Sequence, residues 1–556
     1  MNRSVASSQV LTDLAIIVGV WFALIAIFAL LGRTGHGTGL AIGTIGEDQN
    51  WIALLQGETS HAIANNFWKI DGRNPLSPWL YIISRPLILF VKNGIALLQY
   101  VVGLSLALAA YGLLRLLAGS NGRWFALSTS TIIAVNQSNA YFDHIIWNFQ
   151  VALCCTIMSI FSYILFLRSE RQWILAYGVS LSFWCVAFHI YTLQSGAIAA
   201  IAICQLAYLS KAMGTKRNAT PEVLSVQALK HGVVVVLDLI PYVTTFAIFL
   251  LTWTTVTGPG NGFPYQFSFE RFLSSLQTGF FHQDTALMLE VLRLSTFTAQ
   301  YVTVSILFAF AVTYLVALIA PEVPRGQMVA RYLIIMLIVI SIALPTILLE
   351  SGGIEWSPGS RWRMIYQVTT PILIMSIAGS SLSVFRSRYS SFLFRIFSGV
   401  LLAASLAFSL AYNERQVSLT KSEAAVRQAM RDAIVERRVE GSTNPLFFIL
   451  EMDDSFQWLA TEALRSVYMK TWFPGINVEY RILPSPRYSP SNPTKLKFNQ
   501  RGIDTVMGGS VEIPYDQVVL LRASGKSVQR HFSISREEVV THNGDWMVSE
   551  DRVELR

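Results

Sequence analysis

Long apolar runs, separated by short charged segments, make up most of the chain as far as about residue 412. The hydrocarbon core of a bilayer is about 30 Å thick, and about 20 apolar residues cross it as a helix. Runs of this kind cover residues 12–32, 94–118, 124–138, 145–167, 173–189, 194–210, 231–256, 298–320, 329–349, 364–385 and 393–412. The pattern predicts an all-α polytopic membrane domain, residues 1–412, with about 11 transmembrane helices.

The segment between the first two runs, residues 33–93, has a different pattern. Pro75–Lys92 is apolar, but two prolines and Arg85 interrupt it. Upstream of it, Trp51 and Phe67 belong to a set of apolar residues at helical spacing, as in an amphipathic helix that rests in the membrane interface. We therefore expect this long loop to contain surface helices and no span.

The composition changes after the last run, because residues 413–556 are rich in Arg, Glu, Asp and Lys. Residues 414–440 are predicted to form a charged helix. The strand-like runs PLFFILEM, NVEYRIL and DQVVLLRAS follow, with the helix-like run SFQWLATEALRSVYMKTW after the first. This alternation predicts a small C-terminal soluble α/β domain. Asp453 and Asp454 stand between strand and helix, where helix capping explains them better than chemistry.

Composition and charge agree with this division. The chain is 53% hydrophobic and 14% charged, against roughly 25% charged in a soluble domain. The net charge of +8 comes largely from basic residues beside apolar runs, as in topology determinants, so nucleic acid is not an expected partner. All four cysteines fall in apolar runs, which argues against a disulfide framework or a cysteine-based metal site.

Lys and Arg collect in alternate loops, and cytoplasmic loops carry the excess. A cytoplasmic N-terminus puts five successive basic loops inside. They contain Arg115 and Arg123; Arg168 and Arg171; Lys211, Lys216, Arg217 and Lys230; Arg325 and Arg331; and Arg386, Arg388 and Arg395. An odd number of spans then carries the C-terminal domain to the outer side.

Chemically capable residues gather in the loops of that outer side. Glu47 and Asp48 follow the first run, and one carboxylate of such a pair tends to a raised pKa and can act as a base. The pair could also bind a divalent cation, Mg²⁺ or Mn²⁺, although one pair is too few ligands to assign it. Acidic residues just past a helix end are more often only solvated loop charges, and this explanation is favoured for the pair taken alone.

Asp143 and His144 stand where a run begins, and a helix N-terminus there could help to bind a phosphate. Asp143 could equally be a simple N-cap with His144 solvated. His189 and Tyr191 lie at another helix end, where polar aromatic residues are common in the membrane interface, and this structural explanation is favoured for them.

Arg361 and Arg363 lie on the outer side, against the trend of basic residues. A guanidinium matches phosphate oxygens, so the two could bind a phosphate or diphosphate. Glu350 and Glu355 could instead neutralise them.

Together these residues resemble the GT-C glycosyltransferases, most closely the bacterial enzymes that modify O-antigen. Glu47-Asp48 matches the acidic motif of the first outer loop, Trp68 and the run Gly72–Leu76 match a later segment, and Arg361 or Arg363 matches a late-loop arginine. The family often has Asp-Asp at the first position, and here an Asn also interrupts the Gly-Arg-Pro-Leu pattern.

The resemblance implies an inverting transfer of a sugar from a polyprenyl-phosphate donor to a glycan, lipid or protein acceptor on the outer face of a bacterial inner membrane. Asp48 or Glu47 would be the catalytic base. The implied donor-phosphate ligands are Arg361, Arg363, Arg73 and His144, and the implied substrate contacts are Asp143, Trp68, His189 and Tyr191. Membrane lipids are further partners, and no nucleotide is required.

Two other functions remain open. A transporter or flippase of lipid-linked sugars would have ionisable residues within its spans, and Asp238 is the clear acid deep in a predicted run. A glycan polymerase or ligase would need a similar arginine-rich outer loop.

Overall fold

The computed structural model of the protein describes most of the apolar runs and part of the tail. The described residues are 3–30, 55, 76–91, 94–119, 122–138, 146–169, 172–214, 221–257, 269–270, 272–273, 299–320, 328–351, 364–384, 388–439, 446–452, 478–483, 496–498, 502–505, 511–514, 517–524, 527–532, 548–549 and 552–553. The chain folds as two units, residues 1–41 with 58–414, and residues 42–57 with 415–556.

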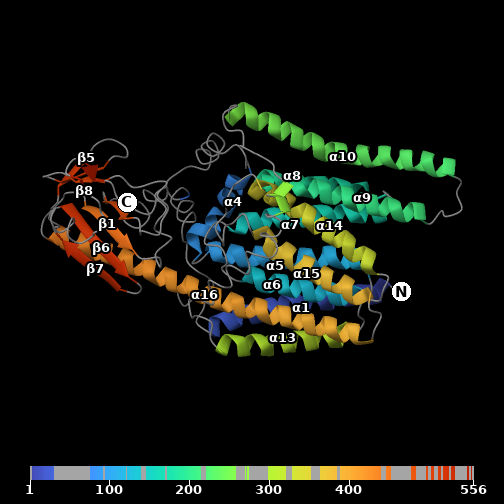
Figure 1. Ribbon diagram of the computed structural model, residues 1–556, viewed down its shortest axis with the longest axis horizontal. Coiled ribbons are helices and arrows are strands. Elements are labelled where there is room, and N and C mark those ends of the chain that lie inside the picture. Colours follow the sequence, from blue (N-terminus) through green and yellow to red (C-terminus); the bar gives the residue numbers. More distant parts are fainter. Residues whose placement is uncertain are drawn as a thin grey trace. The chain divides into compact units, whose positions relative to one another are not determined.

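The first unit is a bundle of helices (Figure 1). They are α1 (Arg3–Leu30), α4 (Ser77–Phe90), α5 (Gly94–Ala118), α6 (Arg123–Ser138), α7 (Ile146–Arg168), α8 (Ile174–Ile190), α9 (Gly196–Gly214), α10 (Pro221–Thr257), α13 (Ala299–Ile319), α14 (Val329–Ser351), α15 (Met364–Val384) and α16 (Arg388–Val439), with a 3-10 turn η3 (Thr192–Ser195). The residues of α16 from 415 onward belong to the second unit. Each apolar run of the sequence coincides with one of these helices, so the prediction of helical runs is confirmed.

Eight helices among the described residues are long and apolar enough to cross a membrane: α1, α5, α7, α10 and α13–α16. The apolar segments of α8 and α9 are shorter, and α6 has 16 residues. A lipid-exposed backbone must satisfy its own hydrogen bonds, which a helix does. The protein is therefore an integral, multi-pass membrane protein with an all-helical membrane region.

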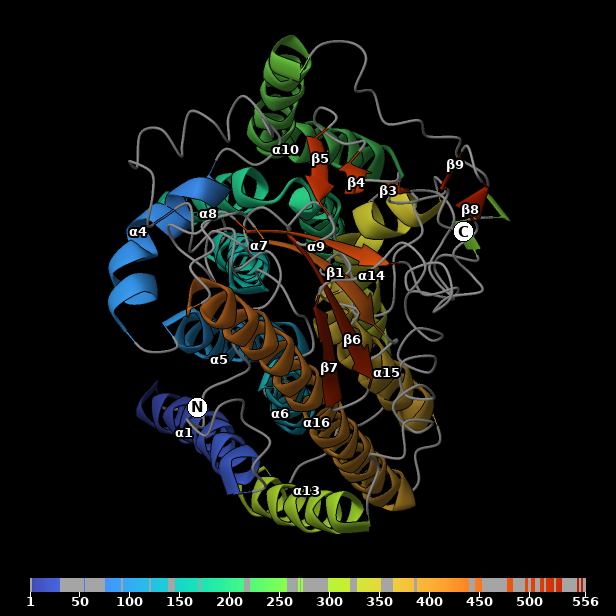
Figure 2. The same cartoon turned by 90° about the vertical axis from the view of Figure 1, so that its left-hand side faces the viewer.

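The helices α5, α6, α7, α14 and α15 form the centre of the bundle, and α10 lies on its margin. In the apolar stretch of α7, 67% of the residues are buried inside the protein, whereas in the apolar stretch of α10 only 11% are. Figures 1 and 2 place α10 along one side and α1 with α13 along the opposite side. The exposed apolar faces of α10 and α13 are the surface that lipid would cover.

The helix α4 lies in the segment for which no span was expected. Its 14 residues extend about 21 Å, which is shorter than the ~30 Å of hydrocarbon. Tyr81 and Ile88 are buried, whereas Trp79, Ile83 and Phe90 are exposed. The helix is thus apolar on its exposed side as well as its buried side, and it is too short to span; its position at the membrane surface remains a prediction.

Three helices are longer than the sequence suggested, and one of them is α1, which begins at Arg3, ahead of the apolar run at 12. The helix α10 begins at Pro221, ahead of the apolar run at 231. The last span and the charged helix predicted at 414–440 form one continuous helix, α16. Residues 400–439 contain neither Gly nor Pro, so no residue ends the helix where its surroundings change from apolar to charged.

The second unit contains a four-stranded sheet, in the order β2-β1-β6-β7. Its strands are β1 (Leu446–Met452), β2 (Val478–Leu483), β6 (Val518–Ser524) and β7 (Ser527–Phe532). The strand β1 pairs in parallel with β2 and β6, and β7 is antiparallel to β6. The three strand-like runs of the sequence are β1, β2 and β6, and these predictions are confirmed.

Further strands of this unit form two small antiparallel sheets. They are β3 (Leu496–Phe498), β4 (Gly502–Thr505) and β5 (Val511–Pro514) in one sheet, and β8 (Val548–Ser549) and β9 (Arg552–Val553) in the other. The predicted helix between β1 and β2, together with Asp453 and Asp454, lies outside the described residues.

Candidate functional site

Two candidate residues from the sequence belong to the described residues, His189 and Tyr191. The other candidates lie outside the described residues: Glu47, Asp48, Trp68, Arg73, Asp143, His144, Arg361 and Arg363. What the structure does describe are the helix ends that flank most of them.

His189 lies in the last turn of α8, with its imidazole among aromatic rings. Its Nδ1 lies 2.7 Å from the carbonyl oxygen of Cys185, and since a carbonyl only accepts, Nδ1 carries the proton. Phe188 and Phe249 meet the imidazole edge-on, with centroids 5.7 and 5.8 Å away. In the neutral imidazole Nε2 is then an acceptor, suited to a hydroxyl group.

Tyr191 caps the same helix with an extended backbone and is buried. Its ring packs against Phe149 of α7 at a centroid distance of 4.3 Å and a near-perpendicular angle of 82°, which is a favourable edge-on geometry. Tyr191 therefore fixes the end of α8 against the start of α7. This contact agrees with a structural role for the side chain.

The end of α8 also binds the start of α4. The backbone N–H of Leu76 donates to the carbonyl oxygen of His189 at 3.0 Å. Beside it, Nδ2 of Asn148 in α7 donates to Oγ of Ser77 at 2.9 Å, and both side chains are buried. The start of α4 is thereby held by two other helices.

Two more contacts join neighbouring elements, one between the ends of α6 and α15 and one from the middle of α7 to η3. Nδ2 of Asn136, near the end of α6, donates to the carbonyl oxygen of Gln367 at the start of α15, at 3.2 Å. Oγ1 of Thr156 donates to Oε1 of Gln194 in η3 at 2.7 Å. We call the end of the bundle that contains Leu76, Asn136, Asn148, His189 and Gln367 the amide end.

Arginines meet at the opposite end of the same helices. Arg123 begins α6 and Arg168 ends α7. Asn136 lies about 20 Å from Arg123 along α6, and Asn148 lies about 30 Å from Arg168 along α7, at 1.5 Å per residue. We call the end of the bundle that contains Arg115, Arg123, Arg168 and Arg331 the arginine end.

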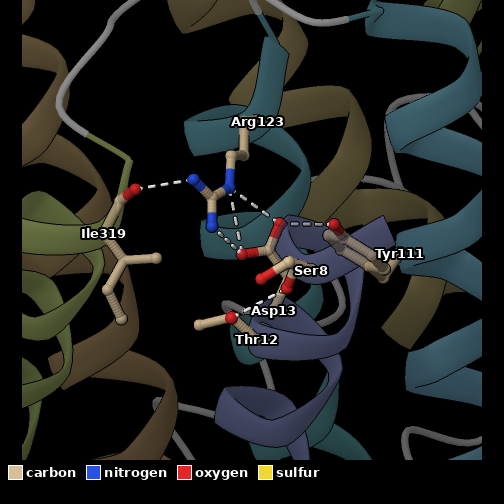
Figure 3. A network of polar contacts seen from close by, with 6 residues as sticks. All are labelled: Ser8, Thr12, Asp13, Tyr111, Arg123 and Ile319. Atoms are coloured by element: carbon tan, nitrogen blue, oxygen red, sulfur yellow. Dashed lines mark hydrogen bonds and ion pairs between the residues drawn. The ribbon is translucent and has the colours of Figure 1, made fainter. Parts of the chain in front are cut away.

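An ion pair that the sequence reading missed lies at the arginine end (Figure 3). Asp13 of α1 is fully buried. Its carboxylate accepts from Nε of Arg123 at 2.9 Å, from Nη2 of Arg123 at 2.6 Å and from the hydroxyl of Tyr111 at 2.5 Å. Nη1 of Arg123 donates to the carbonyl oxygen of Ile319 at 2.6 Å. These hydrogen bonds, which we call the Asp13 fork, join α1, α5, α6 and α13.

A signal for this pair was present in the sequence. Asp13 begins the first apolar run and Arg123 precedes the third, so the basic-loop pattern already placed both at one end of the bundle. An acid that close to lipid requires a partner, and the next loop on the same side offered two basic residues, Arg115 and Arg123.

A second acid lies within α10. Oδ2 of Asp238 accepts from Nε2 of Gln205 at 2.9 Å and from the hydroxyl of Tyr163 at 3.3 Å. The hydroxyl of Tyr177 donates to the backbone carbonyl of Asp238 at 2.8 Å. Asp238 thus attaches the marginal helix α10 to α7, α8 and α9, and the hydroxyl of Tyr242 adds a hydrogen bond to Oγ of Ser180 in α8 at 2.7 Å.

Within the part of the chain that the structure describes, no three His, Cys, Asp or Glu side chains lie together as metal ligands would. Comparison of the chain with protein-family models, with curated proteins and with solved structures finds no match.

Proposed function

We propose that the protein is a GT-C-type glycosyltransferase that transfers a sugar from a polyprenyl-phosphate donor to a glycan, lipid or protein acceptor. One observation carries the proposal: the described flanks of the candidate loops meet at the amide end. Leu76 follows Arg73 by three positions, Asn148 follows His144 by four, and Gln367 follows Arg363 by four. Contacts between these flanks support a single site built from loops far apart in the sequence.

The proposal includes a topology of eleven spans, with α6, α8 and α9 added to the eight long apolar helices. Its N-terminus is cytoplasmic, its C-terminal α/β domain is periplasmic, and its membrane is a bacterial inner membrane. The arginine end supports this orientation, because basic residues collect on the cytoplasmic side. A lipid-linked donor would then reach the amide end laterally from the outer leaflet.

In the proposed reaction, the acceptor hydroxyl attacks the anomeric carbon and its proton passes to Asp48 or Glu47. The bond from that carbon to the phosphate oxygen breaks, and the oxygen leaves with the electron pair, so that a glycoside and polyprenyl phosphate result. General base catalysis contributes about 10² to 10⁴ in rate. Arg361, Arg363 and Arg73 would stabilise the negative charge on the leaving phosphate.

Described residues have a part in this reaction as well. Nε2 of His189 would accept a hydrogen bond from a sugar or acceptor hydroxyl. Asn148 would position the end of the first outer loop through Ser77. Asp143, His144 and Trp68 complete the proposed substrate contacts, and Mg²⁺ or Mn²⁺ at Glu47 and Asp48 is an optional element of the proposal.

A cell-free assay with labelled polyprenyl-phosphate sugars tests the proposal. Membranes with the wild-type chain should consume one donor, and Asp48→Asn or Glu47→Gln should reduce transfer at least about 100-fold. Asp432→Asn is the matched control, because Asp432 pairs with Gln428 one turn away in α16 and has no proposed role. Full transfer by both acidic-pair variants, or no donor consumption by wild type, would refute the proposal.

Transport of lipid-linked sugars is the second candidate, favoured by the acid Asp238 within α10. A transporter would move the donor across proteoliposomes unchanged, and Asp238→Asn would slow that movement. The transferase instead consumes the donor and retains activity in Asp238→Asn. A polymerase or ligase would differ in its product, because it transfers whole glycans from the lipid carrier.

A further inference from the structure

Three arginines surround the last turn of α5 at the arginine end. Nη1 of Arg115 donates to the carbonyl oxygen of Gly119, and Nη2 of Arg168 donates to the carbonyl oxygen of Leu116. Nη1 of Arg331 donates to the carbonyl oxygen of Ala118 at 2.5 Å. The guanidinium groups thus come from α5, α7 and α14 to the end of one helix.

No carboxylate among the described residues balances these charges. Arg123 is paired with Asp13, whereas Arg115, Arg168 and Arg331 bind backbone carbonyls, with Met328 sulfur as a further contact of Arg331. Arg331 is close enough to Arg168 for the two positive charges to repel each other. The C-terminal end of a helix offers only about half a negative charge, so within the described part of the chain most of the three positive charges remain unbalanced.

Donor groups also remain at this cluster. A guanidinium has five N–H groups in a fixed fork, and each of the three arginines uses one amino group on a carbonyl. Arg168 and Arg331 are exposed. An acceptor with several oxygens and a negative charge would satisfy both their remaining donors and the charge.

The arginines stand at the ends of apolar stretches, which is the level where lipid phosphates would lie. Arg168 is the last residue of the apolar stretch Asn148–Arg168, and the stretch Leu97–Ala118 ends three residues after Arg115. Arg331 lies in the first turn of α14. Basic clusters at span ends are attracted to anionic headgroups, about 1 kcal/mol for each Lys or Arg.

Gly119 completes the geometry of the cluster. Its φ of +72° is a left-handed conformation that glycine adopts without strain and that often ends a helix. A Cβ at this position would meet the guanidinium of Arg331. The glycine therefore leaves the space in which Arg331 reaches the carbonyl of Ala118.

We propose that Arg115, Arg168 and Arg331 form a phosphate-binding site for the headgroup of an anionic lipid. The planar guanidinium groups match phosphate oxygens, and the α5 carbonyls hold the side chains in place. The site is separate from the amide end and independent of the proposed transferase activity. Its ligand class is a phosphodiester at the membrane surface.

The test uses the full chain in nanodiscs of phosphatidylcholine, with phosphatidylglycerol added in steps. Phosphatidylglycerol should raise the thermal unfolding midpoint of the wild-type protein, and native mass spectrometry should find it bound. Arg168→Gln removes one of the two exposed members of the cluster, the other being Arg331, and should weaken binding about five-fold, the change that corresponds to about 1 kcal/mol. Arg431→Gln, in the exposed part of α16, is the matched control and should bind as wild type does.

Two controls keep the result decisive. Arg168→Lys retains the charge without the planar fork, so it should fold and bind with intermediate strength. A second sample, in phosphatidylcholine nanodiscs with inorganic phosphate in the buffer, shows whether a free anion has the same effect as the anionic lipid. The proposal is overturned if Arg168→Gln binds phosphatidylglycerol as strongly as Arg431→Gln does, or if inorganic phosphate alone reproduces the rise in midpoint.

Discussion

The replacement Asp13→Asn removes the negative charge from the fork that joins α1, α5, α6 and α13. Arg123 then keeps its positive charge with only 13% of its side chain exposed. Asparagine can still accept a hydrogen bond, but it cannot balance the guanidinium. Breaking a buried ion pair by removing one partner costs about 3–5 kcal/mol.

The position of the pair puts the expected cost at the lower limit of that range. Arg123 is the first residue of α6, so its long side chain can turn toward the membrane surface once it is released. We expect Asp13→Asn to lower the free energy of unfolding by about 3 kcal/mol. Tyr111→Phe removes one hydrogen bond from a carboxylate that keeps Arg123, and should cost about 1–2 kcal/mol.

The measurement is the free energy of unfolding in mixed micelles of a mild detergent and SDS, followed by tryptophan fluorescence. A double-mutant cycle with Arg123→Gln isolates the interaction between Asp13 and Arg123. We expect the double variant to lose about 2 kcal/mol less free energy of unfolding than the sum of the losses in the two single variants. Asp432→Asn is the control for loss of a carboxylate. A cost for Asp13→Asn equal to this control, or single costs that add within about 0.5 kcal/mol, would show that the pair does not hold the helices together.

The remaining predictions concern glycines, a polar contact and the topology. Gly196→Ala should lower the free energy of unfolding by about 1–3 kcal/mol, because the added Cβ would meet the backbone of α14. Gly178→Ala should be neutral or stabilising, because no atom lies within 4 Å of the added Cβ. Thermal unfolding compares the two variants. Ser77→Ala leaves the buried side-chain amide of Asn148 without its acceptor and should lower the free energy of unfolding by about 1–3 kcal/mol. If Asn148 positions the loop, Ser77→Ala should also reduce sugar transfer, and Ser77→Thr should restore it. Alkaline phosphatase fused after Arg556 should be active and a green fluorescent protein there dark; the reverse would overturn the proposed orientation.

The helices could be predicted from the sequence because their causes are local. An apolar run of span length has to become a helix in lipid, and the basic residues at its ends mark where it stops. The strands β1, β2 and β6 were likewise recognised from short apolar runs of suitable residues. The continuity of α16 was missed because a change from apolar to charged composition looks like a boundary, although no residue there ends a helix.

Of the candidate site, the sequence placed His189 and Tyr191 at a helix end, which is where they lie. It assigned no part to Asn148, Gln194 or Gln367, because uncharged amides within apolar runs have no spacing that marks them. Their contacts to Ser77, Thr156 and Asn136 depend on which helices are neighbours, and neighbours are a property of the folded bundle.

The sequence by itself thus determined the class of protein, the helical runs and the gathering of basic residues in alternate loops, because each follows from the contrast between lipid and water along one segment. Only the tertiary structure decided which polar groups become partners. Asp13 meets Arg123 across 110 positions and Tyr111 across 98, and three arginines share the end of α5. Those pairings arise from helix packing, in which residues far apart in sequence come within hydrogen-bonding distance where lipid offers the charges no other partner.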